Sequence, residues 1–351
     1  MVQSLVGLND LQESFHIIDN GQSGLSGIIA IHSTALGPAA GGCRFLTYNS
    51  DKEMSHDAAR LARGMSYKNA LAGLPFGGGK AVIKRPVGDF DRVALFRAFA
   101  NAVASLEGRY ITAEDVGTSI QDMNIVRQRT PYVAGLEPKP GKAGGDPSPW
   151  TALGVFESMQ AAANFTFGSD IGGLTVAVQG VGNVGANLCH LIKNAGGRLI
   201  IADVDRARVD HLALELDAQV VSVNEIHSVE ADIFAPCALG AVLNDRTIPN
   251  LKARLICGGA NNQLGSDKDG HTLLSREIVY APDYLVNAGG IINVAAEYLG
   301  ETTEQVRERV NQIANRLTTV LASAERNKQP PHIIADETAE QIIIGTRRAA
   351  A

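Results

Sequence analysis

Two lysines in the first third of the chain could bind an anion or transfer a proton. Lys68 continues the apolar stripe of a predicted helix, and Lys80 directly follows three glycines. A lysine on an apolar helical face must extend its ammonium to solvent or find an anionic partner, because an unpaired buried charge is costly. We therefore expect Lys68 either to extend to solvent or to find an anionic partner. Two lysines that lie near each other would lower one another's pKa, which makes one of them a plausible proton-transfer group.

Two adjacent carboxylates, Glu114 and Asp115, follow a strand-like run in the same part of the chain. Acids at the end of a strand can simply cap the next turn. Near two lysines, a carboxylate that acts as a base becomes the better interpretation. We therefore predict that one of these two carboxylates belongs to a proton-transfer site.

The glycines before Lys80 are similar to a phosphate-binding P-loop, but the match fails. The pattern requires glycine where Leu74 stands and serine or threonine where Ala81 stands. A nucleoside triphosphate site is therefore not expected. The glycine run instead predicts a flexible loop that presents Lys80 just before a strand.

A second glycine pattern predicts a dinucleotide site. A β-branched run over 174–178 leads into Gly180-Val-Gly182-Asn-Val-Gly185, a helix is predicted over 183–195, and the next apolar run ends at Asp203. Gly180 would permit the tight turn, Gly182 would let the backbone approach a pyrophosphate, and Gly185 would let the helix pack on the strand. A glycine-rich turn without a ligand is the simpler alternative.

The acid that closes this unit bears on the choice of nucleotide. Asp203 would accept hydrogen bonds from the ribose hydroxyls and would repel a 2′-phosphate. This favours NAD over NADP, although Arg206 and Arg208 follow closely enough to leave NADP open.

Alternating strands and helices must position these residues. Six strands are predicted in the second half, over 174–179, 198–203, 219–223, 231–235, 253–257 and 284–287, with helices such as 206–216 between them. This pattern predicts a parallel sheet covered on both faces, with ligands at the carboxyl ends of its strands. The first half is expected to mix strands at about 26–32, 80–85 and 109–113 with helices at about 51–72 and 90–106.

We therefore predict an α/β protein with two domains around a cleft. A segment rich in proline and glycine, 137–149, predicts a hinge between them. An N-terminal α/β substrate-binding and oligomerisation domain is expected over 1–145, and a doubly wound, Rossmann-type NAD-binding domain over 146–324. Helices are predicted over 291–299 and 303–327, and a C-terminal helix at about 325–351 would return to the first domain.

The bulk composition restricts the class of protein. With 351 residues, two domains are the natural expectation, and a net charge of -6 argues against a nucleic-acid-binding or membrane-binding surface. No apolar run approaches the ~20 residues of a membrane span, and no secretory signal precedes the first domain. The four cysteines are far apart, so neither a metal site nor a disulfide is expected, and the protein is predicted to be cytoplasmic.

Seven motifs in chain order resemble the leucine/phenylalanine/valine dehydrogenase branch of the glutamate dehydrogenase superfamily, and the leucine dehydrogenases most of all. They are GMSYKNA around Lys68, GGGK ending at Lys80, TAEDVGT around Asp115, QGVGNVG ending at Gly185, APCALG ending at Gly240, ANNQ at 260–263, and YAPDY with NAGG ending at Gly290. The resemblance covers about residues 25 to 300.

The resemblance implies a reaction and roles for individual residues. The reaction is the reversible, NAD-dependent oxidative deamination of a branched-chain L-amino acid to its 2-oxo acid and ammonia. Lys68 would bind the substrate carboxylate, Lys80 would polarise the carbonyl or activate water, and Asp115 would exchange protons with the amine. Further substrate contacts are implied for Ala40, Gly41, Gly42, Met65, Ala113, Asn262, Ile291 and Val294. Cofactor contacts are implied for Arg44, Thr151, Gly180, Gly182, Asn183, Val184, Gly185, Asp203, Ala238, Ala260, Asn262 and Asn287. The same resemblance implies a homo-oligomer, from a dimer up to an octamer.

One alternative substrate stays open, and two other classes of protein are disfavoured because Lys80 and Asp115 are both present and no histidine lies in a glycine-rich strand-end motif. Ala40 stands where leucine dehydrogenases tend to carry a larger aliphatic residue, which is similar to phenylalanine dehydrogenases and leaves room for an aromatic substrate. A nucleotide-binding regulatory protein without turnover would be expected to lack Lys80 or Asp115. A 2-hydroxy-acid dehydrogenase would need a histidine base and an arginine clamp in the strand-end motifs.

Overall fold

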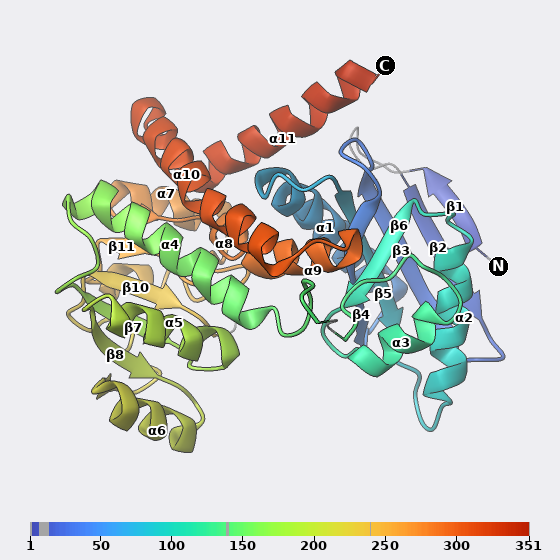
Figure 1. Ribbon diagram of the computed structural model, residues 1–351, viewed down its shortest axis with the longest axis horizontal. Coiled ribbons are helices and arrows are strands. Elements are labelled where there is room, and N and C mark those ends of the chain that lie inside the picture. Colours follow the sequence, from blue (N-terminus) through green and yellow to red (C-terminus); the bar gives the residue numbers. More distant parts are fainter. Residues whose placement is uncertain (1, 7–13, 138–139, 239, 351) are drawn as a thin grey trace. The chain divides into compact units, whose positions relative to one another are not determined.

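The computed structural model describes residues 2–6, 14–137, 140–238 and 240–350 (Figure 1). The chain forms two compact units: the first contains Met1–Gly145, Val294–Thr303 and Ala339–Ala351, and the second contains Asp146–Asn293 and Glu304–Thr338. Parts of four predicted segments lie outside the described residues. These are positions 1 and 7–13 of the first domain, 138–139 of the hinge, 239 of the APCALG motif, and 351 of the C-terminal helix.

The first unit is built on a mixed sheet of six strands. In spatial order they are β1 (Val2–Val6), β2 (Ser14–Asn20), β3 (Leu25–Ser33), β5 (Gly77–Lys84), β4 (Ala39–Leu46) and β6 (Tyr110–Glu114). The pairs from β1 to β5 are antiparallel, whereas β4 is parallel to both β5 and β6. Strand β6 ends at Glu114, opposite Cys43 of β4, so the chain leaves the sheet at Asp115 beside the middle of β4.

Helices cover both faces of this sheet. Helix α1 (Asp51–Leu71) buries Met54, Ala58 and Ala62 against Ile28, Ala30 and Val82. On the other face, α2 (Arg92–Ala104) and α3 (Ile120–Arg127) pack on Ile29, Ile31 and Ile83, among others. Because strand residues alternate between faces, Lys80 shares the α1 face with Val82.

The predicted glycine loop before Lys80 is instead a strand, so that expectation was wrong. Strand β5 begins at Gly77, and Lys80 pairs with Ala30 in its interior. A β carbon at Gly77 would lie 1.8 Å from the carbonyl oxygen of Ser33, and one at Gly78 would lie 2.1 Å from the amide of Ser66. These glycines serve close packing against strand and helix and provide no flexibility.

The second unit is built on a sheet of six parallel strands, as predicted. In order they are β12 (Val279–Tyr280), β11 (Leu255–Ile256), β10 (Ile233–Pro236), β7 (Thr175–Gln179), β8 (Arg198–Ala202) and β9 (Gln219–Val220). The chain order runs outward in both directions from β7, so the switch point of a doubly wound sheet lies between β7 and β10. Ligands of such sheets bind at this point.

Seven α-helices lie within residues 148–327, between and after the strands of this sheet, in the described part of the structure. They are α4 (Ser148–Phe167), α5 (Asn183–Asn194), α6 (Arg206–Leu216), α7 (Asp267–Ser275), α8 (Asp283–Val286), α9 (Gly289–Leu299) and α10 (Thr303–Asn327). The two helices predicted after the glycine motif, together with α9 and α10, lie within two residues of their expected bounds.

The strand predicted over 284–287 is wrong, because that segment forms helix α8. The last strand of the sheet, β12, precedes it by three residues. The run Tyr284-Leu-Val is apolar because Leu285 and Val286 are buried, and a run of four residues carries no periodicity that separates a strand from a helical turn.

The division of the chain differs from the predicted one in two segments. Residues 294–303 group with the first unit, and 325–338 group with the second. Helix α11 (Pro331–Ala350) explains the latter, because Tyr284 donates to the carbonyl of His332 and to the carboxylate of Asp336 in its first half. Further along the helix, Glu340 accepts a hydrogen bond from Tyr67 of the first unit. Among the described residues, no helix is long and apolar enough to cross a membrane.

Candidate functional site

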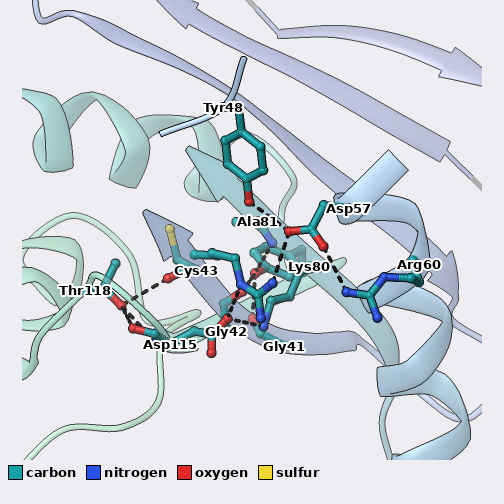
Figure 2. Close-up of polar contacts among 12 residues, drawn as sticks. Gly41, Gly42, Cys43, Tyr48, Asp57, Arg60, Lys80, Ala81, Asp115 and Thr118 are labelled. Carbon is teal, nitrogen blue, oxygen red and sulfur yellow. Dashed lines mark hydrogen bonds and ion pairs between the residues drawn. The ribbon is translucent and has the colours of Figure 1, made fainter. Parts of the chain in front are cut away.

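Lys80 and Asp115 form a close ion pair in the first unit. The Nζ atom of Lys80 lies 2.6 Å from Oδ2 of Asp115, and the two side chains are 7% and 22% exposed (Figure 2). Burial acts to raise the pKa of Asp115, but the charges of Lys80 and Arg44 outweigh it and hold the pKa below its ordinary value. Asp115 is therefore ionised at neutral pH, beside a lysine that is shielded from solvent.

Arg44 joins this pair to a second carboxylate. Its Nε atom lies 3.3 Å from Oδ2 of Asp115, and its Nη1 atom lies 3.1 Å from Oδ2 of Asp57. Asp57 also accepts hydrogen bonds from the hydroxyl of Tyr48, at 2.8 Å, and from Arg60, at 3.1 Å (Figure 2). Arg44 was predicted to line the cofactor path, and the structure places it among the charged groups of the first unit.

Backbone contacts fix the strands that carry these residues. The hydroxyl of Tyr110 donates to the carbonyl of Gly41 at 2.6 Å and accepts the amide N–H of Ala81 at 3.0 Å, so it links β4 and β5. Thr118 accepts the amide N–H of Asp115 at 2.9 Å, and its hydroxyl contacts the carbonyl of Cys43 at 3.0 Å. Asp115 thus leaves the end of β6 in a turn that is tied to β4.

Five of the predicted substrate contacts gather around the amino-terminal half of β4 and the part of β6 that pairs with it. Ala40 pairs with Ile111, Gly41 with Thr112 and Gly42 with Ala113 across this strand pair. A β carbon at Gly42 would lie 2.8 Å from Cβ of Asp115, and one at Gly41 would lie 3.2 Å from Cγ of Met65. A side chain at either glycine would therefore clash with its neighbours. The two glycines allow Asp115 and Met65 of α1 to approach the backbone of β4 closely.

The remaining predicted substrate contacts divide between the units. Lys68 lies near the end of α1, half-buried, on the same helix as Met65. Val294 belongs to the first unit, whereas Asn262 and Ile291 belong to the second. Asn262 has a φ of 53°, a left-handed conformation that asparagine tolerates better than most residues.

The glycine motif of the second unit has the geometry that a dinucleotide site requires. Gly180 has a φ of 91°, which glycine alone adopts without strain. A β carbon at Gly185 would lie 2.0 Å from the carbonyl oxygen of Gly180, whereas one at Gly182 would meet nothing within 4 Å. Gly182 also precedes the first residue of α5, so open space lies beside the unpaired N–H groups of a helix N-terminus.

Asp203, directly after β8, makes a hydrogen bond to the backbone of this motif. Its Oδ2 atom accepts the amide N–H of Val181 at 2.7 Å, and its Oδ1 atom accepts that of Asp205 at 2.9 Å. The carboxylate is therefore oriented by two backbone donors at the strand end next to the glycine turn.

Other predicted cofactor contacts lie at the same strand ends or on helices α4 and α5. A β carbon at Gly180 would lie 2.9 Å from Cβ of Ala238, and one at Gly259 would lie 2.7 Å from a methyl group of Val184. The amide of Ala260 donates to the carbonyl of Pro236 at 2.9 Å. Asn183 begins α5, and Thr151 lies in the first turn of α4.

Asn287 offers a free acceptor in this region. It follows α8 and does not end a strand, and its Nδ2 atom donates to the carbonyl of Gly259 and to Oδ1 of Asn261. Its own Oδ1 atom is buried without a hydrogen-bond partner. An orphaned acceptor of this kind fits a ligand that carries an amide N–H donor.

Asp57 and Tyr48 were not identified from the sequence, although one signal was available. Asp57 precedes Lys68 by eleven residues, about three helical turns, so both lie near the same side of α1. An acid next to the apolar stripe of a helix requires a partner, just as the lysine does. The identity of that partner, Arg44 on β4, could not be inferred from helical periodicity.

Comparison with known proteins gives matches along most of the chain. Residues 12–132 match the family described as "Glu/Leu/Phe/Val dehydrogenase, dimerisation domain", and residues 198–348 match "Glutamate/Leucine/Phenylalanine/Valine dehydrogenase". The chain is 50% identical to the leucine dehydrogenase of Geobacillus stearothermophilus over 329 residues, covering 93% of this chain and 89% of that protein. It is 44% identical to the valine dehydrogenase of Streptomyces coelicolor, covering 91% and 88%.

A solved structure extends the likeness to three dimensions. The L-tryptophan dehydrogenase of Nostoc punctiforme superimposes with a TM-score of 0.87 at 39% identity, covering 96% of this chain and 97% of that one. The two-unit architecture is therefore similar to that of a solved amino-acid dehydrogenase.

Proposed function

The chain belongs to the glutamate/leucine/phenylalanine/valine dehydrogenase family, and on that basis we propose that it deaminates branched-chain L-amino acids with NAD as the oxidant. The reaction is the reversible conversion of leucine, valine or isoleucine to the 2-oxo acid and ammonia. The observation that carries the proposal is the shielded ion pair of Lys80 and Asp115 beside the small residues of β4. The leucine and valine dehydrogenases that the chain resembles support the choice of substrate.

The residues of the second unit fit a nicotinamide dinucleotide. The pyrophosphate would lie over Gly182 at the start of α5, where a β carbon meets open space. Asp203 would accept hydrogen bonds from the ribose hydroxyls, and the orphaned acceptor of Asn287 would receive the carboxamide N–H. We propose NAD as the preferred form, because a carboxylate at Asp203 repels a 2′-phosphate.

The residues of the first unit would supply binding and proton transfer. Lys68 would hold the substrate carboxylate as its cationic partner. Asp115, held in its ionised form, would accept a proton from the substrate ammonium and so free the lone pair of the amine. When bound, NAD would accept the hydride from Cα of the substrate and so leave an iminium group.

Hydrolysis of that iminium would use the same two side chains. Once Asp115 carries the proton from the amine, Lys80, at 2.6 Å from it, would release its own proton to solvent and then, in its neutral form, accept one from the water that adds to Cα. The lysine, charged again, would stabilise the new hydroxyl group. Asp115 would return its proton to the departing nitrogen, and ammonia would leave with the 2-oxo acid as the second product. The hydroxyl proton leaves with the nitrogen as ammonium when the carbonyl forms, and the proton that Lys80 released stays in solvent. Both side chains return to their starting forms, so one lysine and one carboxylate are sufficient.

The character of the pocket supports an apolar substrate. Ala40, Met65 and Ala113 carry no charge, so the carboxylate of a glutamate side chain would have no partner among them. Such a pocket separates leucine from valine weakly, because a methylene group contributes only about 1–3 kcal/mol. An aromatic substrate is the second candidate, supported by the small side chain of Ala40 and by the likeness to an L-tryptophan dehydrogenase.

We propose further that the first unit forms a homo-oligomer, since residues 12–132 match a dimerisation domain. The same unit would bind the substrate, and the second would bind NAD. We propose a cytoplasmic location for the enzyme, as expected from its sequence.

Substitution of Lys80 tests the proposed function. Lys80→Ala is expected to lower kcat for leucine about 100- to 10,000-fold, the range that proton-transfer groups contribute. The affinity for NADH, measured by fluorescence titration, should stay within about twofold, because the candidate cofactor residues lie mainly in the second unit.

A lysine of the same strand provides the matched control. Lys84 ends β5, and its Nζ atom lies 3.7 Å from Asp51, away from the ion pair. Lys84→Ala should retain near-normal turnover. If Lys80→Ala turned over leucine at a rate similar to that of Lys84→Ala, Lys80 would have no part in proton transfer.

A further inference from the structure

Four charged side chains form a chain of alternating sign in the first unit. Lys80 and Arg44 both contact Oδ2 of Asp115, at 2.6 and 3.3 Å, and Arg44 continues to Oδ2 of Asp57 at 3.1 Å. Figure 2 shows Asp115 and Asp57 on opposite sides of this group, with Tyr48 and Arg60 on the side of Asp57. The proposed reaction uses Lys80 and Asp115 and leaves the other members of the chain without a role.

We propose that Asp57 is a positioning residue, which holds Arg44 against Asp115 and thereby orients the carboxylate that exchanges protons with the amine. This proposal rests on the proposed function. Asp57 forms its ion pairs with Arg44 and Arg60, and Arg44 in turn contacts Asp115, so Asp57 acts through Arg44.

The geometry of Arg44 explains why a second carboxylate is needed. An arginine side chain has several rotatable bonds, and a single contact of 3.3 Å from Nε would leave its guanidinium free to turn. The bond from Nη1 to Asp57 fixes the plane of the group at a second point. At 20% and 17% exposure, Arg44 and Asp57 are shielded enough for this pair to be stronger than a surface ion pair.

Asp57 is itself held in place on both of its oxygens. Oδ2 accepts the hydroxyl of Tyr48 as well as Arg44, and Oδ1 accepts Arg60. Burial acts to raise the pKa of Asp57, but these donors outweigh it and hold the pKa below its ordinary value. Asp57 is thus a fixed negative charge in the part of α1 that lies over the sheet.

The charges that face Asp115 determine the direction of the expected effect. Lys80 on β5 and Arg44 on β4 are the cations, and both lower the pKa of Asp115. Cys43 and Tyr110 also face it, and burial raises the pKa of each, so they are neutral near pH 7; Tyr48 is neutral for the same reason. If Arg44 moved away, Asp115 would lose one of its two cations, and its pKa would rise.

Asp57→Asn is the direct test, because asparagine keeps the size of the side chain and removes the charge that holds Arg44. We expect kcat for leucine to fall about 10- to 100-fold, the scale of a displacement of about 1 Å in a reacting group. The KM values for leucine and NAD should change less than about threefold. The acid limb of the profile of kcat/KM against pH should move to higher pH by about one unit.

Arg60→Gln is the matched control. Arg60 binds the same carboxylate, but through Oδ1 and with 48% of its side chain exposed, so its loss leaves the contact to Arg44 in place. Its kcat and pH profile should match the wild-type values. Tyr48→Phe removes a neutral hydrogen-bond donor from Oδ2 of Asp57 and should lower kcat in the same way as Asp57→Asn, but less strongly. This variant tests the proposal even if Asp57→Asn fails to fold.

A double-mutant cycle of Asp57→Asn and Arg44→Gln shows whether Asp57 affects kcat through Arg44 or independently of it. If Asp57 acts through Arg44, Asp57→Asn should add nothing to the loss of kcat caused by Arg44→Gln. Additive losses would overturn the proposal. A raised KM for NAD with an unmoved acid limb would overturn it as well, because Arg44 would then serve the cofactor. Failure of the wild-type protein to oxidise any amino acid would count against the proposed function, whereas a wild-type rate in Asp57→Asn would count against Asp57 alone.

Discussion

At the scale of single residues, the candidate site depends on how its charges are compensated. Asp115 is a partly buried carboxylate, and burial alone would favour its neutral form. Lys80 and Arg44, which both contact one of its oxygens, keep it charged. Arg44 also pairs with Asp57, so each carboxylate in this group of charged side chains has a basic partner. A proton can therefore enter and leave this group without leaving an unpaired charge in a shielded site.

Asp203 provides a test of the dinucleotide site. Asp203→Asn retains an oxygen for the amide of Val181 but removes the negative charge. We expect the KM for NAD to rise and the preference for NAD over NADP to weaken, because the repulsion of a 2′-phosphate is lost. Initial rates with both nucleotides measure this preference.

Asp205 is the control for that change, two residues along the chain. It caps α6 by accepting the amide N–H of Arg208, and asparagine caps a helix about as well. Asp205→Asn should therefore leave the nucleotide preference unchanged. An unaltered preference in Asp203→Asn would mean that the carboxylate braces the glycine turn and takes no part in the choice of nucleotide.

The residues that lie in sequence motifs could be identified in advance, and those that act across elements could not. Gly180, Gly182 and Gly185 have the backbone geometry that the motif requires, because the motif specifies local backbone conformation, whereas their contact with a cofactor stays a prediction. The contact between Arg44 and Asp57 joins a strand to a helix. Its existence depends on tertiary packing, which neither residue spacing nor composition encodes.

At the scale of elements, α1 and β5 are packed more closely than the sequence indicated. The glycine run of β5 suggested a mobile loop, because glycine is frequent in both settings. A β carbon at Gly78 would lie 2.1 Å from the amide nitrogen and 2.5 Å from Cα of Ser66. The backbone of α1 therefore rests directly on the strand that carries Lys80, and this contact sets the distance between the two elements.

Two alanine substitutions test this packing. Gly78→Ala should destabilise the protein by about 1–3 kcal/mol, the cost of an overpacked interior, and should lower activity by displacing Lys80. Gly64→Ala, on the exposed side of the same helix, meets nothing within 4 Å and should stabilise the protein by about 1 kcal/mol. Thermal unfolding of the two variants should shift in opposite directions. Equal or inverted shifts would contradict the close packing of α1 on β5.

Helix α3 is stabilised by a buried carboxylate that makes its contribution dependent on pH. Asp122 is 2% exposed, accepts two hydrogen bonds from Arg92 at 2.7 and 2.8 Å, and completes a capping box with Ser119. Burial acts to raise the pKa of Asp122, but these donors outweigh it and lower the pKa below its ordinary value. The charged form is therefore the one that stabilises the fold.

The sign of the resulting pH dependence follows from this lowered pKa. The stabilisation is complete above the unfolded pKa of about 4 and is lost as the pH falls through the lower folded value. Asp122→Asn should destabilise the protein by about 1.5–3 kcal/mol at pH 7 and pH 5, and by less at pH 3.5. Urea unfolding at the three pH values measures the difference, with the exposed Asp89→Asn as control. A loss that is equal at pH 3.5 and pH 7 would refute the assignment.

At the scale of the whole molecule, the architecture of both units follows from hydrophobic patterning. The parallel sheet of the second unit was predictable because buried strands alternate with helices over 174–257. Strands β1, β2 and β4 and helix α3 were not predicted, since glycine-rich or short segments carry a weak periodic signal. The path of α11 across both units depends on contacts between distant segments and was only partly anticipated.

The central claim concerns the reaction, and one assay of the wild-type protein tests it most directly. NADH formation at alkaline pH would be followed for L-leucine, L-valine, L-isoleucine, L-phenylalanine, L-tryptophan and L-glutamate at equal concentrations. We predict the highest kcat/KM with leucine, valine or isoleucine, and no turnover with glutamate. A preference for phenylalanine or tryptophan would contradict the branched-chain assignment and make Ala40 the determinant of an aromatic pocket. Absence of NADH formation with all six would contradict the proposed reaction itself.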